Sequence, residues 1–442
     1  MSRPQPLSGF PELLPRQRIV EQQVVDHLRR AFELHGFAGV QTRAVEPMDQ
    51  LLRKGETSKE VYVLRRLQAD DDAEGAGLGL HFDLTVPFAR YVLEHAGKLQ
   101  FPFRRYQIQP CWRGERPQEG RFREFWQADI DIVDQGELPA HYEVELPIVI
   151  ADALRGLPLP PVRMHVNNRK LCQGFYRGVG IEDTDEALRI VDKLDKIGAD
   201  AVRKLLMDEL GASAEQAEAC LRLAGIASED ASFVDEVKAL GVSDPLLDEG
   251  LGELAAVVEA AAAEAPGLVV ADLKIARGLD YYTGTVYETF LEGRESLGSV
   301  CSGGRYDTLA SDGKHTYPGV GLSIGVSRLL VPLLQAGTLT ATREVPTCVL
   351  VALSAEEDRT GANAIARRLR ARGVPTQVAP SAAKYGKQIK FADKRGIPFV
   401  VFPGKEEVED QVKDIRSGEQ VPVDVDAWEP PAEDLHPRIV AG

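Results

Sequence analysis

Cysteine is scarce in this sequence, and its few copies stand far apart. The 442 residues include five, with no Cys-x-x-Cys pair and no histidine nearby at zinc-ligand spacing: Cys111, Cys172, Cys220, Cys301 and Cys348. This pattern argues against a disulfide framework or a zinc module, and it favours five reduced thiols. We predict no dedicated metal-binding residue.

Long apolar runs and an excess of positive charge are also missing. No apolar stretch is long enough to span a bilayer, and the opening segment MSRPQPLSGFPELLPRQ is polar and broken by proline, unlike a signal peptide. We therefore expect a cytoplasmic protein with no membrane partner. The net charge of −16 argues against indiscriminate nucleic-acid binding, which needs a broad cationic surface. A nucleic-acid partner would have to contact local basic patches.

What is present indicates a globular protein of several domains. Apolar residues make up 44% and charged residues 27% of the chain, and such a length suggests about three domains. Apolar residues at four-residue steps predict a helix over 12–35. Residues 181–266, rich in Ala, Leu, Asp and Glu at helical spacing, predict an all-helical insertion.

The C-terminal part of the chain has a different pattern. We interpret the polar segment 336–345 as a linker. From residue 346, the strand-like segments TCVLVAL, VPTQVA and IPFVVF alternate with helical ones. The sequence thus predicts a large domain over 1–335 that contains the insertion, and a small α/β domain over 346–442.

The most informative stretch is CWRGERPQEGRFREFWQADIDIV, residues 111–133. Side chains of a strand alternate between its two faces. Alternation from residue 121 puts Arg121, Arg123, Phe125, Gln127, Asp129 and Asp131 on one face, and Phe122, Trp126, Ala128, Ile130 and Ile132 on the other, which Glu124 interrupts. The preceding strand adds Arg105, Gln107, Gln109 and Arg113, and the loop GERPQEG predicts an antiparallel hairpin that merges the two polar faces.

Two interpretations fit this polar face about equally. Arginine forks match phosphate oxygens, a phenylalanine ring can stack on a base, and carboxylates can hold an ammonium or imidazole group. The face would then bind a ligand with phosphates, a purine and an amino acid. Alternatively, it is the solvated side of a sheet stabilised by cross-strand ion pairs.

Three further segments favour the ligand site. ARGLDYYTGTVYE, residues 276–288, places Arg277, Tyr281 and Tyr282 just before a strand, and CSGGRYD, residues 301–307, adds a double glycine before Tyr306. PGVGLSIGVSRLL, residues 318–330, departs from a dinucleotide fingerprint in its last glycine. We interpret it as a tightly packed strand-to-helix junction whose Arg328 faces the site, although a surface salt bridge is the alternative.

Together these segments resemble the histidyl-tRNA synthetases, a family of class II aminoacyl-tRNA synthetases, over nearly the whole chain. WRGERPQEGRFREFWQ resembles the motif 2 hairpin, PGVGLSIGVSRLL motif 3, RGLDYYTGTVYE the histidine-specific element and FDLTVPFAR the segment that binds the amino acid. GFAGVQTRAVEPMDQ is a diffuse match to motif 1. The resemblance implies an α+β fold: a catalytic domain with a six-stranded antiparallel sheet flanked by helices, a helical insertion, a C-terminal α/β anticodon-binding domain over 346–442, and a homodimer.

The resemblance also implies roles for individual residues in ligating L-histidine to tRNA(His) through histidyl-adenylate. Histidine would contact Asp83, Leu84, Thr85, Gln127, Asp131, Tyr281, Tyr282 and Tyr306; ATP, accompanied by Mg²⁺, would contact Arg113, Glu115, Arg121, Phe125 and Arg328; and Arg113 and Arg277 would be catalytic. The family often has glutamate where this chain has Asp83 and Asp131, so the shorter acids have less reach toward the ligand.

For tRNA, the resemblance implies that Arg116 and Gln118 in the motif 2 loop reach the acceptor end and that the C-terminal domain binds the anticodon. In that domain Lys384, Lys387, Lys390 and Lys394 recur at helical spacing, which favours a tRNA-binding face over a merely solvated one in so acidic a chain.

Two other functions compete with histidine ligation. The regulatory subunit of ATP phosphoribosyltransferase resembles the synthetase catalytic domain and senses histidine without charging tRNA. It lacks the anticodon-binding domain and usually has degraded catalytic motifs. In this chain the C-terminal domain is present and the catalytic motifs are intact. A nucleotide-binding interaction module with no chemistry would not need its arginines to converge.

Overall fold

A computed structural model describes residues 4–52, 60–66, 77–275, 281–404 and 408–442. The chain divides into two compact units. One contains Val25–Pro332 with the N-terminal residues up to Pro11, and the other contains Glu12–Val24 with Leu333–Gly442. Helix α1 (Pro15–Leu34) belongs in part to each unit, and it confirms the helix predicted near the N-terminus.

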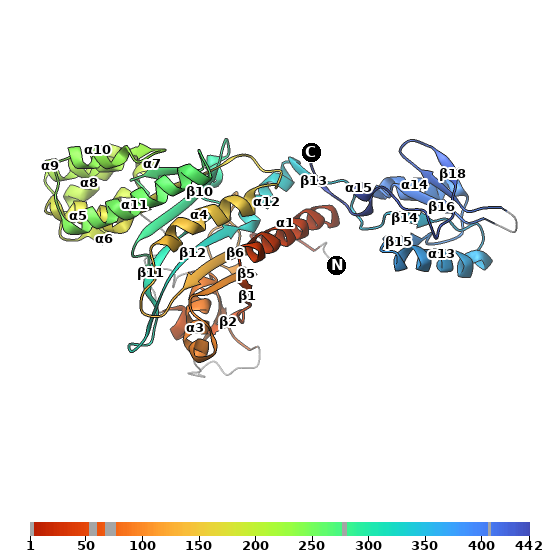
Figure 1. The fold of residues 1–442 in the computed structure, drawn as a ribbon, viewed down its shortest axis with the longest axis horizontal. Coiled ribbons are helices and arrows are strands. Elements are labelled where there is room, and N and C mark those ends of the chain that lie inside the picture. The colour runs from red at the N-terminus through yellow and green to blue at the C-terminus, as the bar shows by residue number, and fades with distance from the viewer. Residues whose placement is uncertain (1–3, 53–59, 67–76, 276–280, 405–407) are drawn as a thin grey trace. The chain divides into compact units, whose positions relative to one another are not determined.

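The larger unit is built on one mixed β-sheet, which has nine strands in the part of the chain that the structure describes (Figure 1). From edge to edge the strands are β1 (Ala38–Gly39), β5 (Phe103–Trp112), β6 (Glu124–Val133), β12 (Thr316–Gly325), β11 (Cys301–Ser311), β10 (Thr285–Leu291), β7 (Val162–Asn168), β9 (Val269–Asp272) and β8 (Ala227–Ser228). The six strands from β5 to β7 are antiparallel throughout, as predicted. The sheet is wider than predicted, because β1 joins β5 and β9 joins β7 in parallel, and β8 extends the far edge.

Helices cover one face of this sheet. The carboxylate of Glu143 on α4 (His141–Leu154) accepts a hydrogen bond from the backbone N–H of Thr285 and pairs with Arg305 on β11. Helices α5 (Arg169–Gly178) and α11 (Pro245–Glu264) pack against each other and against β7, and α11 also contacts β9 and β10. Arg305 therefore points away from the face that carries its neighbour Tyr306.

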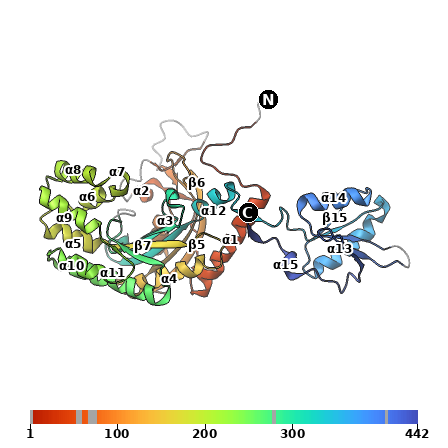
Figure 2. The same cartoon turned by 90° about the horizontal axis from the view of Figure 1, so that it is seen from above.

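The predicted insertion forms a helical cluster at the β7 end of the sheet (Figure 2). Its helices are α6 (Thr184–Val191), α7 (Leu194–Ile197), α8 (Ala199–Leu210), α9 (Ala214–Ala224) and α10 (Phe233–Ala239), followed by α11. The segment is not entirely helical, because the short strand β8 within it pairs with β9.

The opposite face of the sheet carries the polar residues of the hairpin. Here α3 (Thr85–His95) lies close to β11, and a small sheet of β2 (Val45–Pro47), β4 (Leu78–Leu80) and β3 (Val63–Leu64) lies beside α2 (Met48–Leu51). The strand β12 leads directly into α12 (Val326–Gln335), as predicted for the strand-to-helix junction.

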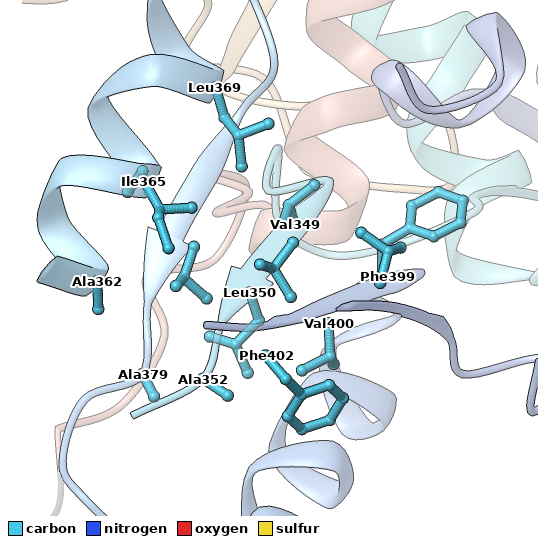
Figure 3. Close-up of a cluster of buried hydrophobic side chains, with 14 of the residues drawn as sticks. Val349, Leu350, Ala352, Ala362, Ile365, Leu369, Ala379, Phe399, Val400 and Phe402 are labelled. Carbon is cyan, nitrogen blue, oxygen red and sulfur yellow. The ribbon is translucent and has the colours of Figure 1, made fainter. Parts of the chain in front are cut away.

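The smaller unit has its own sheet and core. In the described residues its strand order is β15 (Thr376–Val378), β14 (Val349–Val351), β16 (Phe399–Phe402), β17 (Gln411–Asp414) and β18 (Gln420–Pro422). The first three are parallel, because α13 (Arg359–Ala371) and α14 (Tyr385–Arg395) make the crossovers. Buried side chains such as Leu350, Leu369 and Val400 fill the core (Figure 3).

The segment predicted to be a linker, 336–345, is partly structured. It contains β13 (Leu339–Ala341), which pairs antiparallel with the chain's last strand, β19 (Ile439–Ala441). The nearby helix α15 (Ala432–Leu435) supplies backbone carbonyls to which the buried Arg343 donates.

Candidate active site

The register between β5 and β6 merges two rows of polar side chains into a single sheet floor. Arg105 lies opposite Asp131, Gln107 opposite Asp129 and Gln109 opposite Gln127. All six residues are buried, and Arg105 is 0% exposed. The floor is therefore no solvated surface, since α3 covers part of it with the ring of Phe88, 4.3 Å from the Arg105 guanidinium.

Asp131 is held from two sides. Its Oδ2 lies 2.6 Å from Arg105 Nη2, and its Oδ1 accepts a 2.7 Å hydrogen bond from the Tyr306 hydroxyl. Burial raises the pKa of Asp131 to about 6, although Arg105 and Tyr306 both favour its ionised form. A carboxylate fixed in this way can recognise an imidazole or ammonium group.

Asp83 lies in the same recess, at the start of α3. Its Oδ1 accepts from the backbone N–H of Val86, and its Oδ2 is 3.5 Å from the Tyr281 hydroxyl, which also bonds to Thr85. Burial raises the pKa of Asp83 as well. The rings of Tyr281 and Tyr306 meet edge to face at 6.1 Å.

The remaining residues predicted to contact histidine are close by. Leu84 is fully buried beside Asp83, Tyr282 packs against Tyr281 at 5.0 Å, and a Cβ on Gly304 would meet the Tyr282 ring at 3.0 Å. The structure thus brings all of the residues predicted to contact histidine, including Gln127 on the floor, into one region of the larger unit.

Two glycines of β12 provide the space for these side chains. A Cβ on Gly319 would lie 2.5 Å from the Tyr306 ring, and a Cβ on Gly321 would lie 2.1 Å from Asp131 Oδ1. Neither glycine has a positive φ, so close approach rather than backbone conformation requires glycine here.

We predict that Gly321→Ala lowers the free energy of unfolding by about 1–3 kcal/mol, because the added methyl group overpacks against the Asp131 carboxylate and the Ile130 carbonyl. Urea denaturation measures the change. Gly252→Ala is the matched control: this glycine lies in α11 with no atom near its Cβ position, so alanine should be neutral or stabilise by up to about 1 kcal/mol. Equal destabilisation by both substitutions would contradict the steric argument.

Next to this recess is a cleft lined by all five residues predicted to contact ATP. Its lining is Arg113, Glu115, Gly120, Arg121, Phe122, Phe125, Gln127, Ser299, Val300, Ser302, Ser323, Gly325 and Arg328. The prediction that Phe122 faces the apolar core is wrong. Because β6 begins only at Glu124, strict alternation does not extend back to residue 122.

In the cleft, arginine side chains lie around the aromatic ring of Phe125. The Arg113 guanidinium lies 5.0 Å from the centre of the Phe125 ring, and its Nε donates to the Phe82 carbonyl. Arg328 donates to the carbonyls of Gly120 and Ser299, and burial together with the charges of Arg121 and Arg113 lowers its pKa to about 10. This mutual repulsion would be relieved by a polyanion, so the cleft suits a phosphate chain.

The residues predicted to bind tRNA do not line this cleft. Arg116 and Gln118 are exposed on the hairpin loop, and Lys384 and Lys387 are exposed at the start of α14. Arg277 lies outside the described residues. Within the described ranges, no group of three or more His, Cys, Asp or Glu side chains could hold a metal ion, and no helix is long and apolar enough to cross a membrane.

Arg105 and Asp129 were predicted only as members of the polar face, and Ser323 had no predicted role. Alternation along the two strands had already placed Arg105 and Asp129 on the polar face, so the sequence contained the signal that could have singled them out. Their burial depends on the position of α3 above the floor, and the contact between Ser323 and Asp129 depends on the pairing of β6 with β12. The sequence specifies neither.

Comparison with known proteins assigns the family. The family model described as histidyl-tRNA synthetase matches residues 9–329, well over half of the chain. The chain belongs to the histidyl-tRNA synthetase family. A second model, described as an anticodon binding domain, matches residues 347–429.

Curated relatives and solved structures agree with this assignment. The chain is 61% identical to the histidine–tRNA ligase of Cutibacterium acnes, over 100% of this chain and 99% of that protein. It is 58% identical to the histidine–tRNA ligase of Micrococcus luteus, over 99% of each. The crystal structure of histidyl-tRNA synthetase from Nostoc sp. superposes with a TM-score of 0.84 at 33% identity, covering 96% of this chain and 98% of that one.

A solved structure connected with the competing regulatory function is less similar to this chain. The crystal structure of an ATP phosphoribosyltransferase regulatory subunit/histidyl-tRNA synthetase from Bacillus halodurans C superposes with a TM-score of 0.73 at 20% identity. It covers 88% of this chain and 96% of its own. At that identity the likeness concerns the fold alone.

Proposed function

We propose that this protein ligates L-histidine to tRNA(His), using ATP and passing through histidyl-adenylate. The observation that carries the proposal is the close similarity to histidine–tRNA ligases over the full chain. The adjoining recess and cleft support it, because one offers carboxylates and the other offers cations beside an aromatic ring.

The recess would bind the amino acid. Asp83 and Thr85 would hold the α-ammonium group, and Asp131, held by Tyr306, would face the imidazole. Gln127, Leu84, Tyr281 and Tyr282 would complete the walls. The buried acids provide selectivity, because an amino acid without a matching N–H group would leave them without a partner.

The cleft would bind ATP. The histidine carboxylate would attack the α-phosphorus as the bond to the β-phosphate breaks, so that histidyl-adenylate forms and pyrophosphate leaves. Arg113, with Arg277 as its proposed partner, would stabilise the charge that develops on the α-phosphate oxygens. Arg121 and Arg328 would hold the terminal phosphates, with Phe125 and Glu115 at the adenine. Mg²⁺ would enter with ATP as part of the substrate.

The second step would transfer the histidyl group to tRNA. A ribose hydroxyl of the terminal adenosine would attack the carbonyl carbon of the adenylate, and AMP would leave. Arg116 and Gln118 on the exposed loop would guide the acceptor end, and Lys384 and Lys387 would contact the anticodon region. We further propose a homodimer that acts in the cytoplasm.

Pyrophosphate exchange tests this proposal. The purified protein should incorporate labelled pyrophosphate into ATP only when L-histidine is present, and it should charge tRNA(His) in a complete reaction. The other amino acids serve as controls. Histidine binding without any exchange would favour the regulatory function, and exchange with a different amino acid would overturn the proposed specificity.

A further inference from the structure

Three side chains on the floor form a hydrogen-bonded chain. Gln127 Nε2 donates to Ser323 Oγ, and Ser323 Oγ donates to Asp129 Oδ1. The antiparallel pairing of β6 with β12 places Ser323 directly opposite Asp129. Gln127 and Ser323 line the cleft, while Asp129 is 2% exposed behind them.

The direction of this chain follows from the charge of Asp129. An ionised carboxylate only accepts hydrogen bonds, so the single proton of the Ser323 hydroxyl points to Asp129. The serine oxygen can then only accept from Gln127, which must turn its NH₂ group toward Ser323. The amide orientation is thereby fixed by electrostatics.

This orientation leaves the other end of the amide free. Gln127 is 8% exposed, and among the described residues no group donates a hydrogen bond to its buried Oε1. A buried acceptor without a partner is costly, so a bound ligand that donates to this oxygen gains affinity.

We infer that Asp129 and Ser323 are positioning residues that hold the Gln127 carbonyl oxygen toward an N–H donor of the bound amino acid. This inference rests on the proposed function. It adds the hydrogen-bonded chain Asp129–Ser323–Gln127, called the relay below, behind the binding site. If Asp129 takes up a proton, its O–H can donate to Ser323, which can then donate to Gln127 Oε1. The amide reverses and presents its NH₂ group, which repels an N–H donor.

The surroundings of Asp129 allow this change near neutral pH. Burial raises its pKa to about 7, and the negative charges of Asp131 and Asp83 act in the same direction, whereas Arg105, 4.0 Å away, and the Ser323 hydroxyl oppose it. Gln107 lies opposite Asp129 on β5, and among the described residues the charge of Asp129 also acts on the buried thiols of Cys111 and Cys301 and on Tyr282. The relay in its ligand-binding direction should therefore prevail above about pH 7.

A pair of substitutions at one position tests the relay. Ser323→Ala removes the hydroxyl, and Ser323→Thr keeps it. In pyrophosphate exchange at pH 8, we expect Ser323→Ala to raise the KM for histidine about 5- to 10-fold, with the KM for ATP changed less than about twofold, because one neutral hydrogen bond loses its orientation. Ser323→Thr should stay near the wild-type KM for histidine. Equal histidine KM values in the two variants, or a parallel rise in both KM values, would overturn the inference.

The pH profile gives a second, independent readout. The KM for histidine in the wild type should rise more between pH 8 and pH 6 than it does in Ser323→Ala or Asp129→Asn, which have no relay to reverse. Titration of histidine itself is common to all three proteins and cancels in the comparison. Identical profiles would refute the relay, whereas a wild type that shows no histidine-dependent exchange would refute the proposed function itself.

Discussion

Replacing Arg113 by alanine should slow histidine-dependent pyrophosphate exchange by about 10²- to 10³-fold, the usual cost of removing one preorganised donor from a developing anion. Arg113 lies over the Phe125 ring and donates from Nε to the Phe82 carbonyl, so its guanidinium is oriented before any ligand arrives. A side chain positioned in advance loses little entropy in the transition state, and this is why its removal should lower kcat strongly.

The fold should survive this substitution, because the Arg113 side chain is 25% exposed and its neighbour Glu115 keeps an ion pair with Arg121. Arg113→Lys should recover only part of the activity, since an ammonium cannot reproduce the planar fork. Arg222→Ala, an exposed arginine of α9, controls for the loss of one positive charge. Exchange by Arg113→Ala within about threefold of the wild type would remove this residue from the mechanism.

The second large effect concerns stability. Arg105→Met should lower the free energy of unfolding by about 3–5 kcal/mol at pH 8, because it leaves Asp131 and Asp129 buried without their cation. Arg104→Met is the matched control on the same strand. Arg104 faces the other side of the sheet, where it pairs with the partly exposed Glu145, and its loss should cost about 1 kcal/mol or less.

The pH dependence of this loss has a definite sign. The pKa of Asp129 in the folded protein, about 7, is above its ordinary value of 3.8, so the folded state holds a proton that the unfolded state releases in this range. The contribution of Asp129 to the free energy of unfolding is therefore largest at low pH and is lost as the pH rises toward 7. Without Arg105 the ionised carboxylates become still less favourable. Urea denaturation should thus show a smaller penalty for Arg105→Met at pH 5 than at pH 8, and a penalty that grows at low pH would contradict the assignment.

Much of the candidate site could be predicted because its information is local. Alternation along residues 124–133 assigns Gln127, Asp129 and Asp131 to one face whatever the rest of the chain does, and the β5–β6 register confirms it. The rule failed at Phe122, where the chain has not yet entered the strand. Alternation puts the adjacent residues Arg305 and Tyr306 on opposite faces of β11, but only the position of α4 shows that Arg305 pairs with Glu143.

By itself, the sequence determined the strands of the hairpin and the polar row that they share, because the alternation of side chains along a strand acts over a few residues. Only the tertiary structure decided whether the polar face was solvated or buried, since that depends on α3 placing Phe88 against Arg105. It likewise decided that Arg328 and Arg113 share one cleft and that Ser323 meets Asp129. These contacts join residues far apart in the chain, and their register is set by packing across the whole sheet.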